Sequence, residues 1–119
     1  MSVEDAIQNS FVQEIAPATY EYHIAADFPA FEGHFEGNAL LPAVCQLGLC
    51  AAACSRLLGK PVEIAGVVRA KFMRPIVPQS RVHIKISPRQ DGAFLAELSS
   101  AQLPAQKYSQ IICRVKECL

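Results

Sequence analysis

The sequence predicts an α+β fold, in which one long helix packs against an antiparallel sheet. Two observations lead to this prediction. Residues 42–58 form the one long apolar segment with the end signals of a helix, and four later runs alternate between apolar and polar residues with the period of a strand. The chain has 119 residues and no internal repeat or low-complexity linker, so we expect a single domain over residues 1–119.

Pro42 and Gly59 mark the ends of the predicted helix. Proline suits the first turn because its missing N–H would have no partner there, and glycine is common just past the last turn. The apolar side chains lie nearly all round this helix: Val44, Leu47, Leu49, Ala51, Ala52, Ala53, Leu57 and Leu58. A helix without a polar face is normally enclosed, so we expect other elements to cover it.

The predicted strands have apolar residues at every second position. One precedes the helix, with Tyr20, Tyr22 and Ile24 as its apolar set. The four that follow have apolar residues at 68, 70 and 72, at 82, 84 and 86, at 94, 96 and 98, and at 111, 113 and 115. Prolines and an Asp91-Gly92 pair separate these runs as turns.

The composition excludes two classes of protein. Hydrophobic residues make up 51% of the chain and charged residues 18%, which excludes a disordered protein. Lysine plus arginine and aspartate plus glutamate are equal at 11 each, which excludes a nucleic-acid binder that works through bulk charge. So many apolar residues in a short chain indicate that part of the surface is buried against another subunit.

The five cysteines lack the spacing of a metal site. They lie at positions 45, 50, 54, 113 and 118, without a Cys-x-x-Cys pair, and we interpret them as free core thiols in a reducing compartment. The first residues are acidic where a signal peptide is basic, and the apolar stretch 39–54 is shorter than the roughly 20 residues of a membrane span. We therefore expect a cytoplasmic protein without a membrane span, metal or cofactor.

The charges are divided between two parts of the chain. Residues 1–36 contain seven acids and no lysine or arginine, whereas residues 56–89 contain eight basic residues and one acid. Such a division suits an acidic partner that approaches the basic half. The alternative is that these side chains are only the solvated faces of strands.

His34 is the residue most suited to chemistry. His23 and His83 occupy polar positions of predicted strands and are expected to be solvated, but His34 lies between Gly33 and Gly37, just before the helix. A helix N-terminus offers free N–H groups to a carbonyl oxygen, and an imidazole can move a proton near neutral pH. From the residues alone, a histidine that only hydrogen-bonds its own loop stays an open alternative.

Two motifs resemble those of a known enzyme family. Residues 31–44, F-E-G-H-F-E-G-N-A-L-L-P-A-V, resemble the signature F-x-G-H-F-P-G-x-P-x-x-P-G-V of the 3-hydroxyacyl-(acyl carrier protein) dehydratases. Residues 66–78, G-V-V-R-A-K-F-M-R-P-I-V-P, resemble that family's second conserved strand. The V-C-Q-L stretch at 44–47 is similar to the branch of thioester dehydratases associated with aryl-polyene and related lipid pathways.

The resemblance implies a hotdog fold, in which a curved antiparallel sheet wraps a central helix. It also implies elimination of water from a 3-hydroxyacyl thioester, carried by acyl carrier protein, to give a 2-enoyl thioester in fatty-acid or related lipid synthesis. His34 would be the base that removes the α-proton, and a helix N–H at Ala43 or Val44 would hold the thioester oxygen. The other implied substrate-binding residues are Gly33, Phe35, Gly37, Pro42 and Gly48, and the expected carrier-docking residues are Arg69, Lys71 and Arg74.

The resemblance also implies a homodimer or a multiple of dimers, with a heterodimer as the alternative. In this family, a carboxylate fourteen residues after the histidine, on the helix of the facing subunit, protonates the departing hydroxyl. In this chain Gly48 stands at that position, and residues 40–59 contain no acid. The chain also departs from the signature at Glu36, Ala39 and Ala43, which replace two prolines and a glycine.

Three alternatives could replace the family's carboxylate at the departing hydroxyl. Glu36 or Glu32 could donate it, a different hotdog subunit could carry the acid, or water or Gln46 could position the hydroxyl. Two other functions also stay open: an acyl thioesterase, and a non-catalytic or heterodimer-partner subunit that binds acyl chains.

Overall fold

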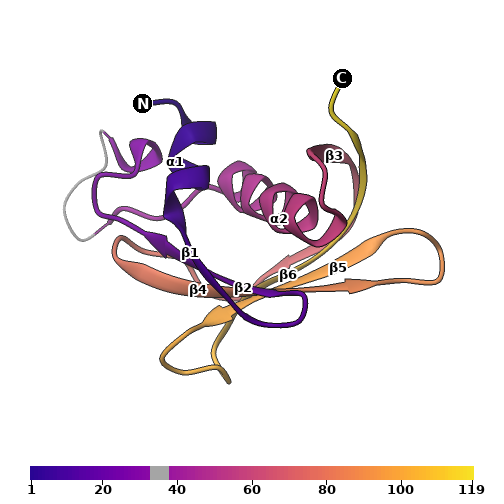
Figure 1. Cartoon of the computed structure of the whole chain (residues 1–119). Helices are drawn as coiled ribbons and strands as arrows, with labels where there is room; N and C mark the ends of the chain where they lie inside the picture. The colour runs from indigo at the N-terminus through magenta and orange to yellow at the C-terminus, as the bar shows by residue number, and fades with distance from the viewer. Residues whose placement is uncertain (33–37) are drawn as a thin grey trace.

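A curved antiparallel sheet lies against one side of helix α2 in the computed structural model, which describes residues 1–32 and 38–119 (Figure 1). The sheet has six strands in the order β1-β2-β4-β5-β6-β3. The elements are α1 (Val3–Ser10), β1 (Phe11–Ala16), β2 (Thr19–Ile24), the short 3₁₀ helix η1 (Pro29–Phe31), α2 (Ala43–Leu58), β3 (Val62–Phe72), β4 (Ser80–Pro88), β5 (Phe94–Ser100) and β6 (Lys107–Glu117). The α+β class and the hotdog arrangement are confirmed.

Helix α2 has the ends that the sequence predicts. Pro42 is its N-cap, and Gly59 follows its last turn with a φ of 70°, a left-handed conformation that glycine adopts without steric cost. Four residues of the side that faces the sheet are fully buried: Leu49, Cys50, Ala53 and Cys54. This side of α2 and the inner face of the sheet form the core.

The central strands show the predicted alternation. Val82, Ile84 and Ile86 of β4 are buried, and Ala96, Leu98, Ile111 and Cys113 continue the same inner face across β5 and β6. Residues between them point to the outer face, because side chains alternate along a strand. The predicted inner faces of these strands therefore agree with the structure.

The two N-terminal elements are absent from the sequence prediction. Helix α1 is capped by Ser2, whose Oγ accepts a hydrogen bond of 3.0 Å from the Asp5 N–H, and its Ile7 packs toward α2. Strand β1 is exposed along nearly its whole length and has no buried alternation. It forms one edge of the sheet through its pairing with β2.

The expectation that α2 is enclosed on all sides is wrong for the single chain. Val44 is 71% exposed, and Leu47, Gly48 and Ala51 beside it are only partly buried. These four residues share one side of the helix because their spacing is three or four residues, and we call them the α2 stripe. In the described chain, α1 reaches this stripe with Ile7 beside Gly48, and the rest of the stripe is open.

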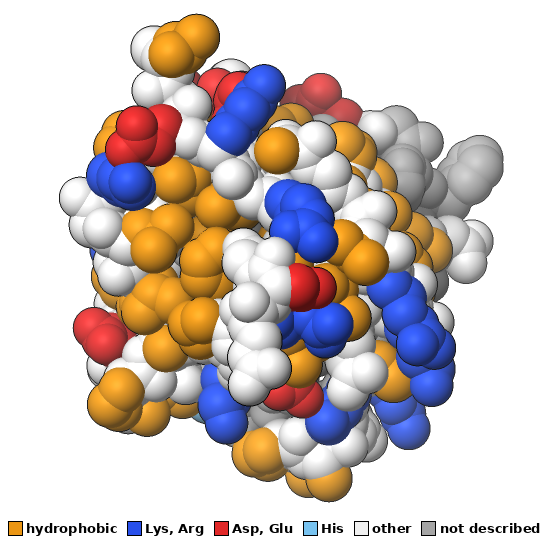
Figure 2. Space-filling view, turned by 90° about the vertical axis from the view of Figure 1, so that its right-hand side faces the viewer, with side chains coloured by type: hydrophobic (Ala, Val, Ile, Leu, Met, Phe, Trp, Pro, Cys, Tyr) orange, Lys and Arg blue, Asp and Glu red, His pale blue; other side chains and the backbone are white. Residues whose placement is uncertain are grey.

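Strand β3 also differs from expectation, since most of its residues are exposed on both faces of the sheet. It is the second edge strand, paired only with β6. Val67, Val68 and Phe72 are therefore exposed instead of half-buried. Seen from the side on which β3 lies, the molecule shows a broad patch of hydrophobic side chains (Figure 2).

The cysteines and the strand histidines are placed as follows. All five cysteines are free thiols; four are buried as predicted, whereas Cys118 is exposed. His23 and His83 are only partly exposed, and their Nε2 atoms lie 3.0 Å from Gln79 Oε1 and 2.9 Å from Glu21 Oε1, so the expectation of fully solvated histidines is wrong. Within the described ranges, no helix is long and apolar enough to cross a membrane.

Candidate functional site

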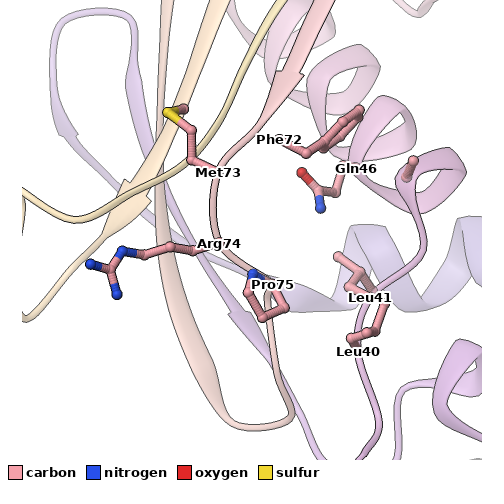
Figure 3. A pocket seen from close by; sticks show the side chains of 8 residues that line it. Leu40, Leu41, Gln46, Phe72, Met73, Arg74 and Pro75 are labelled. Carbon is pink, nitrogen blue, oxygen red and sulfur yellow. The ribbon is translucent and has the colours of Figure 1, made fainter.

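An open cavity of about 320 Å³ lies at the N-terminal end of α2. Figure 3 shows the carboxamide of Gln46 extending from α2 into the space between Phe72 and Leu41. The lining residues come from the segment before α2, from its first turns and from the end of β3: Leu40, Leu41, Ala43, Gln46, Phe72, Met73, Arg74 and Pro75. We call this space the Gln46 cavity.

Main-chain hydrogen bonds hold the two walls of the Gln46 cavity. The Leu41 N–H donates to the Ile76 carbonyl at 2.7 Å, which ties the segment before α2 to the segment after β3. The N–H groups of Met73 and Arg74 both donate to the Tyr108 carbonyl, at 2.9 and 3.2 Å. Although these segments are not regular strands, their backbone is therefore anchored on both sides of the cavity.

The first turn of α2 begins at this cavity with Ala43 and continues with Val44. The N–H groups of Cys45 and Gln46 donate to the Pro42 carbonyl, whereas those of Ala43 and Val44 have no hydrogen-bond partner in residues 1–32 and 38–119. Proline provides no side-chain cap that would occupy them. Free N–H groups at a helix N-terminus, with the positive end of the helix dipole, favour a carbonyl oxygen that gains negative charge.

Gln46 is the buried polar residue of the cavity. It is only 4% exposed, and its Oε1 accepts a hydrogen bond of 2.8 Å from the Oγ of Ser109, a fully buried residue of β6. Because Ser109 holds the oxygen, the amide nitrogen Nε2 points away from β6. Nε2 has no hydrogen-bond partner in the described part of the chain. The sequence indicates Gln46 only as one alternative, and no local signal announces Ser109.

The charge of the cavity comes from one side chain. Arg74 is among the lining residues, although its side chain extends away from Gln46 (Figure 3), and no aspartate or glutamate is among the described lining residues. Burial raises the pKa of the Cys45 thiol, which lies in the first turn of α2, so this thiol stays protonated and is a poor nucleophile. The described walls thus offer hydrogen-bond donors and one cation, but no carboxylic acid.

The predicted site residues fall into three groups. Pro42 and Ala43 lie at the Gln46 cavity. Val44 and Gly48 line a different groove, of about 710 Å³, between α1, α2 and the start of β3. His34, Gly33, Phe35, Glu36 and Gly37 lie outside the described residues, and their assigned roles stay predictions.

Position 48 is in contact with α1. A Cβ atom built at Gly48 would lie 2.6 Å from the Cδ1 of Ile7, closer than real Cβ contacts allow. Ile7 therefore takes up the space into which any side chain at position 48 would first extend. Two small residues of α2, Ala51 and Ala52, line the same groove as Gly48.

The three basic residues predicted for carrier docking are not together. Arg69 and Lys71 line a shallow hollow with Leu95, Gln110 and Ile112. In the β3–β6 pairing they lie opposite Ile112 and Gln110, which alternate with the buried Ile111 and Cys113, so this hollow is on the outer face of the sheet. Arg74 alone adjoins the Gln46 cavity.

Glu32 also lies elsewhere. It is exposed and lines a third cavity together with Asp27, His23 and residues of α1 and β1. Of the two glutamates proposed as proton donors, Glu32 is thus not among the residues around Gln46, and Glu36 lies outside the described part.

Curated relatives match this chain over part of their length. The 3-hydroxyacyl-[acyl-carrier-protein] dehydratase FabZ of Haemophilus influenzae is 32% identical over 72 residues, covering 54% of this chain and 49% of the relative. FabZ of Anaeromyxobacter is 30% identical over 89 residues, covering 66% of this chain and 57% of the relative. The chain thus spans about half the length of the curated relatives it matches.

Solved structures agree in fold. The dehydratase heterocomplex ApeI:P from Xenorhabdus doucetiae matches with a TM-score of 0.69 at 20% identity, covering 87% of this chain and 91% of that chain. The PaaI protein from the phenylacetic acid degradation operon of Escherichia coli matches with a TM-score of 0.61 at 11% identity, covering 96% and 89%. At these identities the likeness concerns the fold alone.

A family model extends the match to most of the chain. The model described as ApeI dehydratase aligns with residues 10–112, which include the helix α2 and all of the sheet except the C-terminal part of β6. It spans both motifs on which the resemblance rests, at 31–44 and 66–78. The chain therefore belongs to the ApeI-like dehydratase family.

Proposed function

We propose that this chain eliminates water from a 3-hydroxyacyl thioester on acyl carrier protein, giving a 2-enoyl thioester, with His34 as the base. One observation carries the proposal: two N–H groups of the first turn of α2, at Ala43 and Val44, have no partner in the described residues, and Ala43 lines the largely apolar Gln46 cavity. They would hold the thioester oxygen, which gains negative charge as the α-proton leaves. Family membership and the H-F-E-G run at 34–37 support the choice of reaction.

The position of Arg74 supports an anionic carrier. Arg74 lines the Gln46 cavity, and its exposed side chain belongs to none of the ion pairs of the described residues. We propose that it pairs with the phosphate of the pantetheine arm, as arginine does with phosphate generally. Arg74→Ala is then expected to raise KM for a carrier-bound substrate about tenfold with little change in kcat. Lys85→Ala, an exposed residue of β4 outside the cavity, is the matched control.

A second hotdog subunit is part of the proposal. The α2 stripe and the exposed β3 together form the apolar surface that such a subunit would bury. Either a second copy or a different chain fits this description. The two cases differ in chemistry, because a second copy brings Gly48 to the facing site, whereas a different chain can bring an acid.

The test follows interconversion of 3-hydroxyacyl and 2-enoyl thioesters by the purified chain. His34→Ala is expected to lower kcat/KM by about 10²–10⁴-fold, because it removes the proton-transfer group. His23→Ala is the matched control, since this histidine lies on β2 and hydrogen-bonds Gln79. Turnover that is unchanged in His34→Ala would overturn the assignment of the base. Release of free thiol without water elimination would instead identify a thioesterase.

Gly48 favours a second candidate function, that of a heterodimer partner whose own site is weak. If so, the chain alone is inactive and activity appears only when a subunit with an acid at the matching position is added. Inactivity alone and activity after mixing would support this candidate. Comparable activity of the chain alone and of the mixture would exclude it.

A further inference from the structure

The inference concerns Gln46, a buried carboxamide with one end fixed and the other end at the cavity. Gln46 and Ser109 are 63 residues apart in sequence, and both are almost fully buried. Five polar or charged residues of the described chain are buried, and this pair is the one whose side chains hydrogen-bond to each other. Buried polar atoms generally have hydrogen-bond partners, so each polar atom of this buried pair needs one.

The geometry of the pair leaves one group to satisfy. The Ser109 hydroxyl donates to Gln46 Oε1 at 2.8 Å, so the oxygen is occupied and faces β6. The Nε2 group has two hydrogens and lies on the opposite side of the carboxamide, toward Leu41 and Pro75 (Figure 3). These neighbours are apolar and offer it no side-chain acceptor. The acceptor must therefore come from whatever enters the cavity or borders it.

The distance along α2 matches the substrate class of the proposed function. Gln46 follows Ala43 by three residues, so their positions on the helix axis are separated by roughly 4.5 Å and lie on neighbouring turns. A 3-hydroxyacyl thioester has its hydroxyl two carbons beyond its carbonyl. With the carbonyl oxygen at the N–H groups of Ala43 and Val44, the hydroxyl extends along the helix toward Gln46.

Resting on the proposed function, we propose that Gln46 Nε2 donates a hydrogen bond to the 3-hydroxyl of the bound thioester, and that Ser109 fixes the orientation of the carboxamide. Gln46 would then be a catalytic residue, because it touches the leaving group. Ser109 would be a positioning residue. The pair lies at the Gln46 cavity, whereas position 48 lines the other groove.

The elimination balances without a carboxylic acid. The proposed base takes the proton from C2, the C2–H electron pair becomes the second bond between C2 and C3, and the C3–O bond breaks with its electron pair on oxygen. The proton on the imidazolium then passes to that oxygen, and water leaves. A carboxamide N–H is too weak an acid to supply a proton, so Gln46 orients the hydroxyl and stabilises its developing charge, while one base handles the proton.

The experiment measures binding and turnover separately. Two non-hydrolysable acyl-pantetheine amides, one with and one without a 3-hydroxyl, are titrated calorimetrically into the His34→Ala protein, which excludes turnover. We expect this protein to prefer the hydroxylated compound about tenfold. Adding Gln46→Leu to this protein is expected to abolish the preference. The affinity for the deoxy compound should stay within about twofold of its value in the His34→Ala protein. The tenfold factor is that of one ordinary hydrogen bond.

Kinetic variants complete the test. With His34 present, Gln46→Leu is expected to lower kcat about 100-fold and KM little, as for the loss of one preorganised donor. Ser109→Ala is expected to lower kcat about tenfold, and Ser100→Ala, a buried serine of β5 outside the cavity, is its matched control. Gln46→Met keeps the length of the side chain without the amide if Gln46→Leu does not fold, and it is likewise expected to lose the binding preference.

The outcomes separate this proposal from the proposed function. Equal weakening of both compounds in Gln46→Leu, a preference that survives it, or binding of neither compound would overturn the role of Gln46. Unchanged turnover in His34→Ala would overturn the base and leave the binding result to stand on its own. A tenfold preference that depends on Gln46 supports the proposal in either case.

Discussion

The side of α2 that carries Gln46 and the side that carries Gly48 differ in what covers them, although the two residues are only two positions apart. At about 100° per residue the two side chains point about 200° apart. The Gln46 side is buried and hydrogen-bonded within the chain, whereas the α2 stripe around Gly48 is open apart from Ile7. The chain thus completes one side of its central helix by itself and leaves the other side open to the proposed second subunit. A group that replaces the family's carboxylic acid therefore has to be sought on both sides of α2.

The largest expected difference between the two sides is in folding stability. Leu49→Ala removes a fully buried side chain between α2 and the sheet and is expected to lower the free energy of unfolding by about 3 kcal/mol. Val44→Ala changes an exposed residue and is expected to change it by less than about 0.5 kcal/mol when the chain is monomeric. Urea denaturation at high dilution measures both, and equal losses would contradict the comparison.

The next largest effect concerns association. Val44→Asp places a charge in the middle of the α2 stripe and is expected to weaken subunit association about 100-fold, or about 2.7 kcal/mol, while the monomer stays folded. Analytical ultracentrifugation measures the change. Leu103→Asp, an exposed leucine between β5 and β6, is the matched control. If Leu103→Asp dissociates the subunits and Val44→Asp does not, the interface lies elsewhere.

The buried side also makes stability depend on alkaline pH. Burial raises the pKa of the Cys50 thiol above its ordinary value of 9.0, so this thiol stays protonated in the folded chain while it ionises in the unfolded chain. The contribution of this protonated thiol to the free energy of unfolding is fully present below pH 9. It is lost as the pH rises further, by up to about 1.4 kcal/mol per pH unit. Unfolding measured between pH 8 and 10 should therefore show a smaller loss in Cys50→Ala. An unchanged slope would contradict this account.

The smallest effect concerns the contact of Gly48 with α1. Gly48→Ala gains helix propensity of about 1 kcal/mol but forces a Cβ against Ile7 Cδ1, so little net change is expected. Ile7→Val removes the Cδ1 atom, and in that background Gly48→Ala is expected to stabilise the fold. A double-mutant cycle on unfolding free energies should give a coupling of about 1 kcal/mol. Additive effects would mean that Ile7 does not limit position 48.

The sequence predicts well those elements that are defined by local signals. The ends of α2 follow from Pro42 and Gly59, and the inner faces of β4, β5 and β6 follow from alternation, because one face of each is buried. Strands β1 and β3 are edge strands, exposed on both faces, so burial imposes no reliable period on them. Helix α1 is short and marked chiefly by its Ser2 cap, a signal that is common outside helices as well.

The candidate site is less predictable, because its contacts join distant parts of the chain. The bond between Gln46 and Ser109 spans 63 residues, and the contact between Ile7 and Gly48 depends on how α1 packs. Neither follows from spacing along a helix. The separation of Arg74 from Arg69 and Lys71 depends on where β3 ends, which the run of basic residues does not reveal.

The edge of β3 has a consequence for the supply of this protein in a cell. Its outer edge, with exposed Val67 and Val68, leaves main-chain groups that can pair with any extended strand, and only such charges as Lys71 oppose this. A chain whose β3 edge is left uncovered would therefore tend to aggregate edge to edge. Its soluble yield should rise when the subunit proposed above is present to cover this edge.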